Sequence, residues 1–500
     1  MAAGLPWFDG DKPSAQAHEA IAVLAAAASH GLEPQDYSAG ALGRAVARAA
    51  QDSPFDAAAT ARMEQALTTA MERYLTDMHI GRIDPQKIRH NFSPPQREPF
   101  DAALYLQAAV AAGRLREAAS EAAPRLPIYA SLREALAGYR ARIDHAAWQM
   151  PLPPLPGGPA AKLVPGQDYA ALAQLAERLA DLGDLPSGLL LPLRYDEPLV
   201  GAIKAFQRRH GLSADGVLSK ATLAQLQVTP AARVRQIELA LERLRWTPLM
   251  QGPRMIVVNI PEFVLRAYEV QDGRIQVQEE MKIVVGKALN TRTPLFDEDM
   301  RFIEFSPYWN VPPSIARAEI VPRLRRDPGY LARQEMEFVS SGGRVDRAVS
   351  DALLDAVLAG KARIRQRPGP NNALGDIKFV FPNQDNIYLH HTPAPELFKR
   401  DRRDFSHGCI RVEHPVELAK FVVKNIPDWT EDRIRTAMSR GQSATLKLPE
   451  PVPVLIAYGT ALVKQDQTFF FDDIYGLDRL LDAALRRHSQ TQPTIYQDAP

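Results

Sequence analysis

The chain has 500 residues, of which 46% are hydrophobic, and this length suffices for about three domains with separate cores. Its 60 basic and 59 acidic residues give a net charge of +1 at pH 7, without the basic blocks that follow a nucleic-acid backbone. Composition therefore argues against a nucleic-acid partner.

The opening segment, MAAGLPWFDGDKPS, lacks the charged and apolar regions of a signal peptide. No stretch of the sequence approaches the run of about 18 apolar residues that a membrane span requires. We expect any export of the protein to depend on a targeting segment that this sequence does not show.

Residues 15–150 are predicted to be helical. Segments such as AHEAIAVLAAAASHGL and AALYLQAAVAAGRLREAASEAA repeat apolar residues every three or four positions, as helices with one apolar face do. No catalytic grouping stands out there, so we expect a helical scaffold domain over residues 1–165. The run PLPPLPGGPAAKLVPG at 151–166 is rich in Pro and Gly and predicts a linker near this boundary.

A compact helical module is predicted over residues 195–226, where a short helix ends at Gly211, an Asp215-Gly216 turn follows, and a second helix completes the pattern. The segment resembles the peptidoglycan-binding domain family through these residues: Val200, Ile203, Phe206, Gln207, Gly211, Leu212, Asp215, Gly216, Thr222 and Leu226. That family usually has a second glycine where this chain has Ser219. We expect the module to span residues 166–230 and a helical connector to span 231–252. A plain helical hairpin is the alternative.

From Met255 the sequence changes to alternating and β-branched runs: MIVVNI, VLRAYEV, MKIVVG, FVFPN and NIYLH. These runs predict a β-rich domain over residues 253–450. Residues from about 310 to 365 break the pattern with prolines and helical segments, and insertions of this length are often lids or binding loops. A strand-like run and a helix close the chain over 451–500. The fold class is therefore α+β and multi-domain, with a helical lid insertion in the β-rich domain.

One 33-residue segment, NIYLHHTPAPELFKRDRRDFSHGCIRVEHPVEL, concentrates the residues suited to chemistry. Cys409 is the single cysteine, so no internal disulfide forms, and its thiol needs a base to become the nucleophilic thiolate. His390 ends one predicted strand and Cys409 starts another, so a strand-loop-strand path could bring them side by side. Gly408 permits close approach of a substrate carbonyl and a turn that aims backbone amides at an oxyanion.

The sequence Ser-His-Gly-Cys-Ile-Arg at 406–411, preceded by a strand-borne histidine, resembles the L,D-transpeptidase catalytic domain (YkuD-like). The runs MKIVVGKALNTRTPLF, SPYWNVPPSIA, YLHHTP and PVPVLIAYGTA resemble the large, multi-domain branch of that family, so the likeness covers about residues 195–480. It implies a cysteine acyltransferase with Cys409 as nucleophile and His390 as general acid and base. His391 stands where the family usually has Gly, Ser or Asp, and as the next residue of a strand it would point to the opposite face.

The resemblance implies supporting roles for neighbouring residues. Gly408 would supply a backbone amide to the oxyanion site, and His407 would support the motif. Arg411 could bind a substrate carboxylate through its planar guanidinium group or stabilise the motif through an ion pair. The residues expected to contact substrate are Arg411, Tyr388, Trp309, Asn310, Ser406 and His391, with Tyr308 beside them.

The implied reaction joins peptidoglycan stem peptides, which would be both donor and acceptor. The thiolate would attack the third-residue carbonyl of a tetrapeptide stem, release D-Ala, and pass the acyl group to an amine to form a 3→3 cross-link. The resemblance also implies acylation by carbapenems and a location in the periplasm or cell envelope. No cofactor or metal is expected.

Three alternative functions follow from the same residues. Water as the acyl acceptor would make the protein an L,D-carboxypeptidase. A non-catalytic peptidoglycan-binding protein would use only the module at 166–230. Zinc binding by the histidines and the cysteine is the third, although the spacing from His407 to Cys409 fits known zinc patterns poorly and there is no second cysteine.

Overall fold

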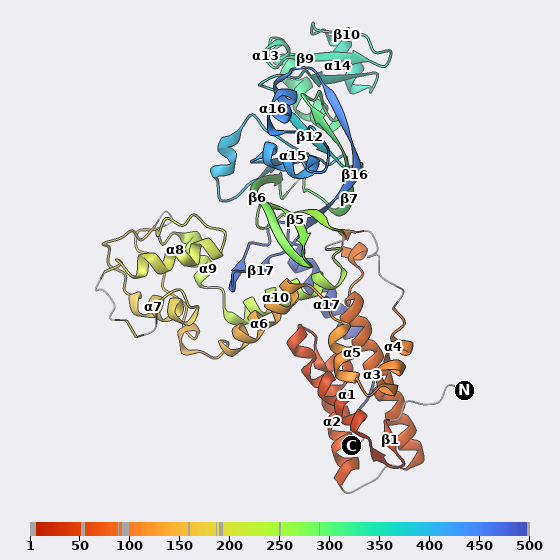
Figure 1. Ribbon diagram of the computed structural model, residues 1–500. Helices are drawn as coiled ribbons and strands as arrows, with labels where there is room; N and C mark the ends of the chain where they lie inside the picture. Colours follow the sequence, from red (N-terminus) through yellow and green to blue (C-terminus); the bar gives the residue numbers. More distant parts are fainter. Residues whose placement is uncertain are drawn as a thin grey trace. The chain divides into compact units, whose positions relative to one another are not determined.

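The computed structural model divides the chain into two units, which are described separately: a helical unit, residues 1–247 with 459–500, and a β-rich unit, residues 248–458 (Figure 1). The structure describes residues 7–51, 56–88, 90–92, 100–158, 161–186, 188–189, 194–249, 252–289 and 291–497. Residues 1–6 of the opening segment and 159–160 of the Pro- and Gly-rich run lie outside the described residues. Within this described part, no helix is long and apolar enough to cross a membrane.

Side-chain caps fix where several helices of the helical unit begin. Ser14, Asp56 and Asp101 each accept a hydrogen bond from a first-turn backbone N–H, which satisfies a donor that has no partner inside the helix. The helices predicted over residues 15–150 are confirmed. The α-helices of the helical unit are α1 (Ala15–Ala25), α2 (Ala39–Gln51), α3 (Ala57–Ile80), α4 (Ala102–Ala111), α5 (Leu115–Glu121), α6 (Pro127–Ala141), α7 (Leu172–Asp181), α8 (Leu199–Arg209), α9 (Lys220–Leu226), α10 (Pro230–Trp246) and α17 (Leu477–Thr491). Short 3-10 turns are η1 (Ala26–His30), η2 (Pro34–Tyr37), η3 (Pro85–Ile88) and η4 (Ala146–Trp148), and short strands are β1 (Phe8–Asp9), β2 (Lys12–Pro13), β3 (His90–Asn91), β17 (Ala461–Lys464) and β18 (Gln467–Phe470).

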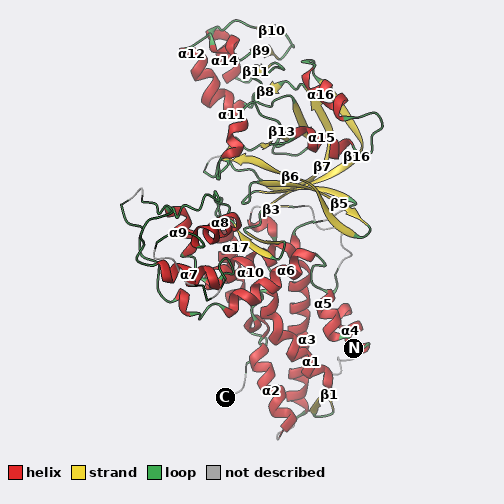
Figure 2. Cartoon of the chain, turned by 60° about the vertical axis from the view of Figure 1, so that its left-hand side comes forward, coloured by secondary structure: helices red, strands yellow, loops and turns green. Residues whose placement is uncertain are grey.

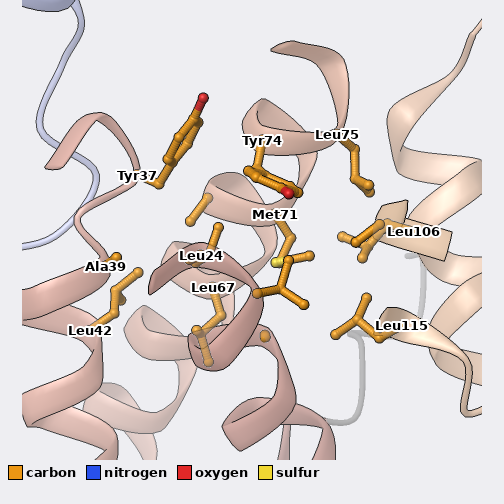
Figure 3. Packing of buried hydrophobic residues seen from close by; sticks show 14 of the residues in the cluster. Leu24, Tyr37, Ala39, Leu42, Leu67, Met71, Tyr74, Leu75, Leu106 and Leu115 are labelled. Atoms are coloured by element: carbon orange, nitrogen blue, oxygen red, sulfur yellow. The ribbon is translucent and has the colours of Figure 1, made fainter. Parts of the chain in front are cut away.

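Helices α1 to α5 enclose an apolar core (Figure 3). Leu24, Leu67 and Met71 are completely buried in it. Tyr37 packs edge-on against Tyr74, with ring centroids 5.5 Å apart. Burial of one Leu or Met side chain contributes about 1.5–3 kcal/mol to the stability of the fold. Packing alone can therefore hold this bundle together without a disulfide.

The helical module around α8 and α9 is built on the buried side chain of Gln207. Its Nε2 donates to the Val217 carbonyl and its Oε1 accepts from the Gly216 N–H, both at 2.9 Å. Ser219 caps α9 by accepting from the Thr222 N–H. The two predicted helices and the turn between them are confirmed, and serine at position 219 has a definite structural role.

The β-rich unit contains a sheet whose strand order closes on itself. Figure 2 shows strands of this sheet, among them β5, β6, β7 and β16, in yellow. The order is β12-β13-β15-β6-β5-β4-β16-β7, and β7 also pairs with β12. The strands of this sheet are β4 (Arg254–Asn259), β5 (Val264–Gln271), β6 (Arg274–Gly286), β7 (Leu295–Phe305), β12 (Ile377–Val380), β13 (Leu389–His390), β15 (Ile410–Val412) and β16 (Ala444–Ala457), with β14 (Asp404–Ser406) paired to β6 off this path. Helices α15 (Pro415–Val423) and α16 (Glu431–Ser439) follow the motif. The predicted β-rich domain is confirmed.

The insertion at about 310–365 differs from the helical lid that the sequence predicted, because it also contains a sheet of order β10-β9-β11-β8. Phe338, Ile364 and Leu324 are buried in a core that belongs to the insertion. The strands of the insertion are too short for an alternation of polar and apolar residues to be recognised in the sequence. Its elements are β8 (Trp309–Asn310), α11 (Pro313–Ile315), the π-helix η5 (Ala316–Ile320), α12 (Val321–Arg326), α13 (Tyr330–Arg333), β9 (Met336–Ser340), β10 (Val345–Asp346), α14 (Asp351–Leu358) and β11 (Ala362–Gln366).

The boundary expected after residue 450 falls inside β16, and the β-rich unit instead ends at Tyr458. The reason is that β16 pairs with β7 on both sides of that point, at 444–447 and at 452–456, and with β4 after it, at 454–457. The hairpin β17–β18 belongs to the helical unit, where Phe470 and Ala461 share a core with α6 and α10.

Candidate active site

Cys409 lies immediately before β15, which pairs in parallel with β13. The register sets His390 opposite Arg411, and the Ile410 N–H donates to the Tyr388 carbonyl at 3.1 Å. Side chains alternate between the two faces of a strand. Tyr388 and His390 therefore share one face of the sheet with Cys409 and Arg411.

The Cys409 side chain is half-buried, and its thiol contacts the Asn386 carbonyl, with Sγ 3.7 Å from that oxygen. Burial raises the pKa of the thiol. Hydrogen bonds from Tyr388, and then the positive charges of Lys378 and Arg411, act in the opposite direction on the same pKa. The neighbourhood thus contains donors and cations that favour a thiolate.

The turn before Cys409 is held by side chains on both sides. Ser406 Oγ donates to the Cys409 carbonyl at 2.6 Å and accepts from the Gly408 N–H at 3.1 Å. Thr293 Oγ1 donates to the Gly408 carbonyl at 2.7 Å. Gly408 has a φ of 122°, a value that residues with a Cβ rarely adopt, so glycine is required there.

This turn bears on two sequence-based expectations. Ser406 was expected to contact substrate, but it is buried and its hydroxyl is engaged within the turn. The Gly408 amide was expected at the oxyanion, but it already donates to Ser406. It could reach a substrate oxygen only if that hydrogen bond opened.

His390 is buried, with 4% of its surface exposed. Its Nδ1 lies 2.5 Å from the His391 carbonyl oxygen. Because a carbonyl can only accept, Nδ1 carries a proton when it makes this bond, and the Leu374 backbone is a second hydrogen-bond partner of the ring. Burial, followed by the charge of Arg411, lowers the pKa of His390 to about 3. The imidazole is therefore neutral at physiological pH and can accept a proton, but a pKa this low makes it a weak base in the resting state.

His391 points away from this face, and its Nδ1 lies 2.7 Å from Asp376 Oδ1. Gly375, which has a φ of 65°, leaves room for the ring, because a Cβ there would lie 2.7 Å from the His391 Cβ. His391 was expected among the substrate contacts. Instead, the alternation along β13 turns it to the far face of the strand.

A cavity of about 870 Å³ opens over Cys409, large enough for a small peptide. Of the expected substrate residues, Tyr388, Asn310 and Tyr308 line it together with His407. Its remaining lining residues are Lys287, Thr291, Val311, Pro312, Pro313, Ser314, Ile315, Ala318, Glu319, Arg363, Leu374, Lys378, Asp385, Asn386 and Ile387. The insertion and the sheet thus both contribute walls.

Two other expected substrate residues lie outside the cavity lining. Trp309 packs against the core of the insertion, and its backbone pairs with Gln366 of β11. Arg411 is half-buried, and within the described residues its buried Nε has no hydrogen-bond partner. Its charge acts on both Cys409 and His390. An electrostatic role for Arg411 therefore fits better than direct recognition of a carboxylate.

His407 connects the motif to the insertion. Its Nε2 lies 2.7 Å from Oε1 of Glu319, which belongs to the π-helix η5. Single π-helical turns of this kind occur often at functional sites. His407 and Glu319 both line the cavity, and Glu319 had no signal in the sequence.

Sequence reasoning also missed Thr293, Asp376 and Lys378. The last two flank Ile377 in β12, so the alternation of polar and apolar residues in that strand was the available signal. Thr293 follows β6 in a loop and gave none. In the described part of the chain, no group of three or more His, Cys, Asp or Glu side chains could hold a metal ion.

Three protein-family models match the chain. Residues 253–442 match YkuD, "L,D-transpeptidase catalytic domain", residues 3–136 match "Scaffold domain", and residues 169–226 match "Putative peptidoglycan binding domain". A Haemophilus influenzae protein described as "Putative L,D-transpeptidase" is 31% identical over 253 residues. That match covers 50% of this chain and 49% of the relative, so it spans about half the length of each protein.

Among solved structures, an L,D-transpeptidase (Yku) from Stackebrandtia nassauensis is similar to this chain. It shares 13% sequence identity and a TM-score of 0.25, covering 60% of this chain and 97% of its own. The family matches, taken with the motif and the closed sheet, assign the parts of the chain. Residues 253–442 are similar to the L,D-transpeptidase catalytic domain of the YkuD family, and residues 169–226, which precede them, are similar to a peptidoglycan-binding domain.

Proposed function

We propose that this protein is a peptidoglycan L,D-transpeptidase in which Cys409 is the nucleophile and His390 is the general base and acid. The observation that carries the proposal is the single thiol in the wall of a peptide-sized cavity, on the same face of the sheet as a neutral histidine. The family match of residues 253–442 supports acyl transfer from a stem peptide.

The first half-reaction forms a thioester. The thiol turns from the Asn386 carbonyl, gives its proton to Nε2 of His390, and Sγ bonds to the third-residue carbonyl carbon of a tetrapeptide stem. The tetrahedral intermediate then collapses, and His390 returns the proton to the leaving nitrogen. D-Ala departs as the free amine, and the tripeptide stays attached to Cys409.

The second half-reaction regenerates the thiol. The side-chain amine of another stem's third residue attacks the thioester carbonyl, and His390 accepts a proton from that amine. As the carbon–sulfur bond breaks, the proton returns to sulfur. The product is a 3→3 cross-link, and the enzyme ends with the thiol and the neutral imidazole with which it began.

Two donors are proposed for the oxyanion: the Tyr388 hydroxyl, which hydrogen-bonds the thiol, and the backbone amide of Cys409. Removal of one oxyanion donor typically slows acyl transfer about 10²- to 10³-fold. The Gly408 amide would join them only after release from Ser406.

Cationic side chains of the cavity would bind the carboxylates of the stem peptide. Lys287 and Arg363 are exposed residues of the lining, and they come from different elements, one after β6 and one on β11. We infer that the domain at 169–226 holds the enzyme on peptidoglycan and that the reaction occurs in the periplasm or cell envelope. Carbapenems would acylate Cys409 as mimics of the donor.

The test is the intact mass of the full-length protein after incubation with a disaccharide-tetrapeptide, with Cys409→Ala and His390→Asn as variants. Wild type should gain the mass of the substrate minus D-Ala, and free D-Ala should appear. Cys409→Ala should gain nothing, and His390→Asn should react at least about 100-fold more slowly, as loss of a general base predicts.

Product analysis then separates the acceptors. Cross-linked dimers support transpeptidation, whereas tripeptide alone, with D-Ala released at the same rate, would assign the protein as an L,D-carboxypeptidase. Absence of both adduct and free D-Ala, in protein that still binds peptidoglycan sacculi, would refute the catalytic proposal in favour of a binding protein.

A further inference from the structure

A row of polar and charged side chains crosses the sheet next to Cys409. The strand register pairs Glu304 of β7 with Lys378 of β12, Lys378 with His390 of β13, and His390 with Arg411 of β15. Side chains of directly paired residues point to the same face of a sheet. The row therefore runs from a carboxylate through an ammonium group and an imidazole to a guanidinium group.

Lys378 is held in this row by two contacts. Its Nζ lies 3.2 Å from Glu304 Oε2 and 4.3 Å from the centroid of the Tyr388 ring. Only 16% of the Lys378 side chain is exposed, and the residue lines the same cavity as Cys409. A cation over an aromatic face at this distance is attracted by the ring. The contact therefore holds the Tyr388 ring in one position.

Tyr388 connects this cation to the thiol. Its side chain hydrogen-bonds Cys409, and burial, followed by the charge of Cys409, raises the pKa of the phenol. The hydroxyl therefore stays protonated and can donate to a thiolate. Lys378 in turn fixes the plane of the ring whose hydroxyl makes that bond.

Until His390 accepts the thiol proton, burial keeps its imidazole neutral, so in the resting state the positive charge beside the thiol comes from other groups. Lys378 and Arg411 are the cations that act on Cys409. Glu304 pairs with Lys378 and partly offsets its charge.

We propose that Lys378 is a positioning residue of the thiol site: its ammonium group, held by Glu304 and the Tyr388 ring, stabilises the Cys409 thiolate, and Glu304 weakens that stabilisation. The pair would set the fraction of reactive thiolate at neutral pH. This inference rests on the proposed function only in assigning Cys409 as the nucleophile.

Other charged groups also face the thiol from the elements packed around it. Those lining the cavity are Lys287, Glu319, Arg363, Asp385 and His407, and Glu396 faces Arg411. None of them is changed in the variants below, so their influence is common to all of the proteins compared.

The test is the rate of iodoacetamide alkylation of the full-length protein between pH 5 and pH 10, followed by intact mass. Cys409 is the single cysteine, so the rate reports on one thiol without any peptidoglycan substrate. Lys378→Met should move the midpoint of the pH profile upward by about half a unit to one unit, which slows alkylation at pH 7 about three- to tenfold. Glu304→Gln should move it downward and speed alkylation about two- to threefold.

Two controls isolate the charge from the fold. Lys378→Arg keeps the charge and should stay within about twofold of wild type. Lys424→Met breaks a comparable ion pair with Glu269 away from the cavity lining and should leave the profile unchanged. A purely structural role of the pair would slow both Lys378→Met and Glu304→Gln, whereas the electrostatic role moves them in opposite directions.

Opposite shifts of the two variants support the proposal. Shifts in the same direction, or unchanged profiles, overturn it. Should Lys378→Met not fold, Glu304→Gln decides alone: a downward shift supports the proposal, and no shift or an upward shift overturns it. Failure of the transpeptidase proposal would appear separately: the two variants would shift the alkylation profile as expected, but the wild-type protein would form no adduct with the tetrapeptide.

Discussion

The buried histidine of the site should make the sheet around it sensitive to acid. His390 has a pKa of about 3 in the folded protein, against an ordinary value of 6.5. The unfolded chain therefore binds a proton more readily than the folded one between these two values. Stability from neutral His390 is complete above about pH 6.5 and is lost progressively as the pH falls toward 3.

The size of the effect follows from the two values. A pH of 5 is about 1.5 units below the pKa that His390 has in the unfolded chain, and each unit corresponds to about 1.4 kcal/mol. Protonation of His390 in the opened chain should therefore lower the free energy of opening by about 2 kcal/mol between pH 7 and pH 5. This is about a thirtyfold change in the opening equilibrium.

Hydrogen–deuterium exchange measures this locally, in peptides that contain β13 and β15. The Ile410 N–H, bonded to the Tyr388 carbonyl, should lose about thirtyfold protection on going from pH 7 to pH 5, after correction for intrinsic exchange. His390→Asn keeps a donor for the His391 carbonyl but cannot titrate, so most of this loss should disappear. Other titrating groups are common to both proteins and cancel in the comparison.

Equal loss of protection in wild type and His390→Asn would refute the reasoning. It would mean that protonation of His390 is not coupled to opening of the sheet in this pH range. An imidazole that charges at pH 5 without opening the sheet could not be the neutral, buried group described here.

Three further substitutions test the packing of the site and of the binding domain. Ser406→Ala should leave the buried Gly408 N–H unpaired, lower the free energy of unfolding by about 1–3 kcal/mol, and slow acylation, as thermal unfolding and intact mass would show. Gly375→Ala should cost about 2 kcal/mol or more, because its φ is 65° and its Cβ would lie 2.7 Å from that of His391; an unchanged melting temperature would contradict this. Gln207→Leu should destabilise residues 169–226 by about 2–4 kcal/mol and weaken sedimentation with peptidoglycan while leaving the alkylation rate of the thiol unchanged.

The broad organisation of the chain was predictable because it depends on local patterns. Apolar residues at three- and four-residue spacing predicted the scaffold helices, and the Gly211 and Asp215-Gly216 signals predicted the turn between α8 and α9. The alternating runs after Met255 predicted the β-rich domain. Each of these signals lies within one helix, strand or turn, so no tertiary contact is needed to interpret it.

The insertion and the end of the β-rich unit were harder to predict for the same reason. Strands of two to five residues in the insertion are too short for alternation to be recognised, and they form only because the order β10-β9-β11-β8 gives them partners. The run at 444–457 was divided at a proline, although pairing with β4 and β7 makes it one strand.

By itself, the sequence determined that this protein has a helical scaffold, a second helical module and a β-rich domain with one thiol in a Ser-His-Gly-Cys turn. Only the tertiary structure decided which side chains surround that thiol. Lys378 meets Glu304 across 74 residues of chain, and His407 meets Glu319 across 88. The physical reason is that strand order and register, which bring distant residues together, arise from packing of the whole sheet and are not written in any local pattern.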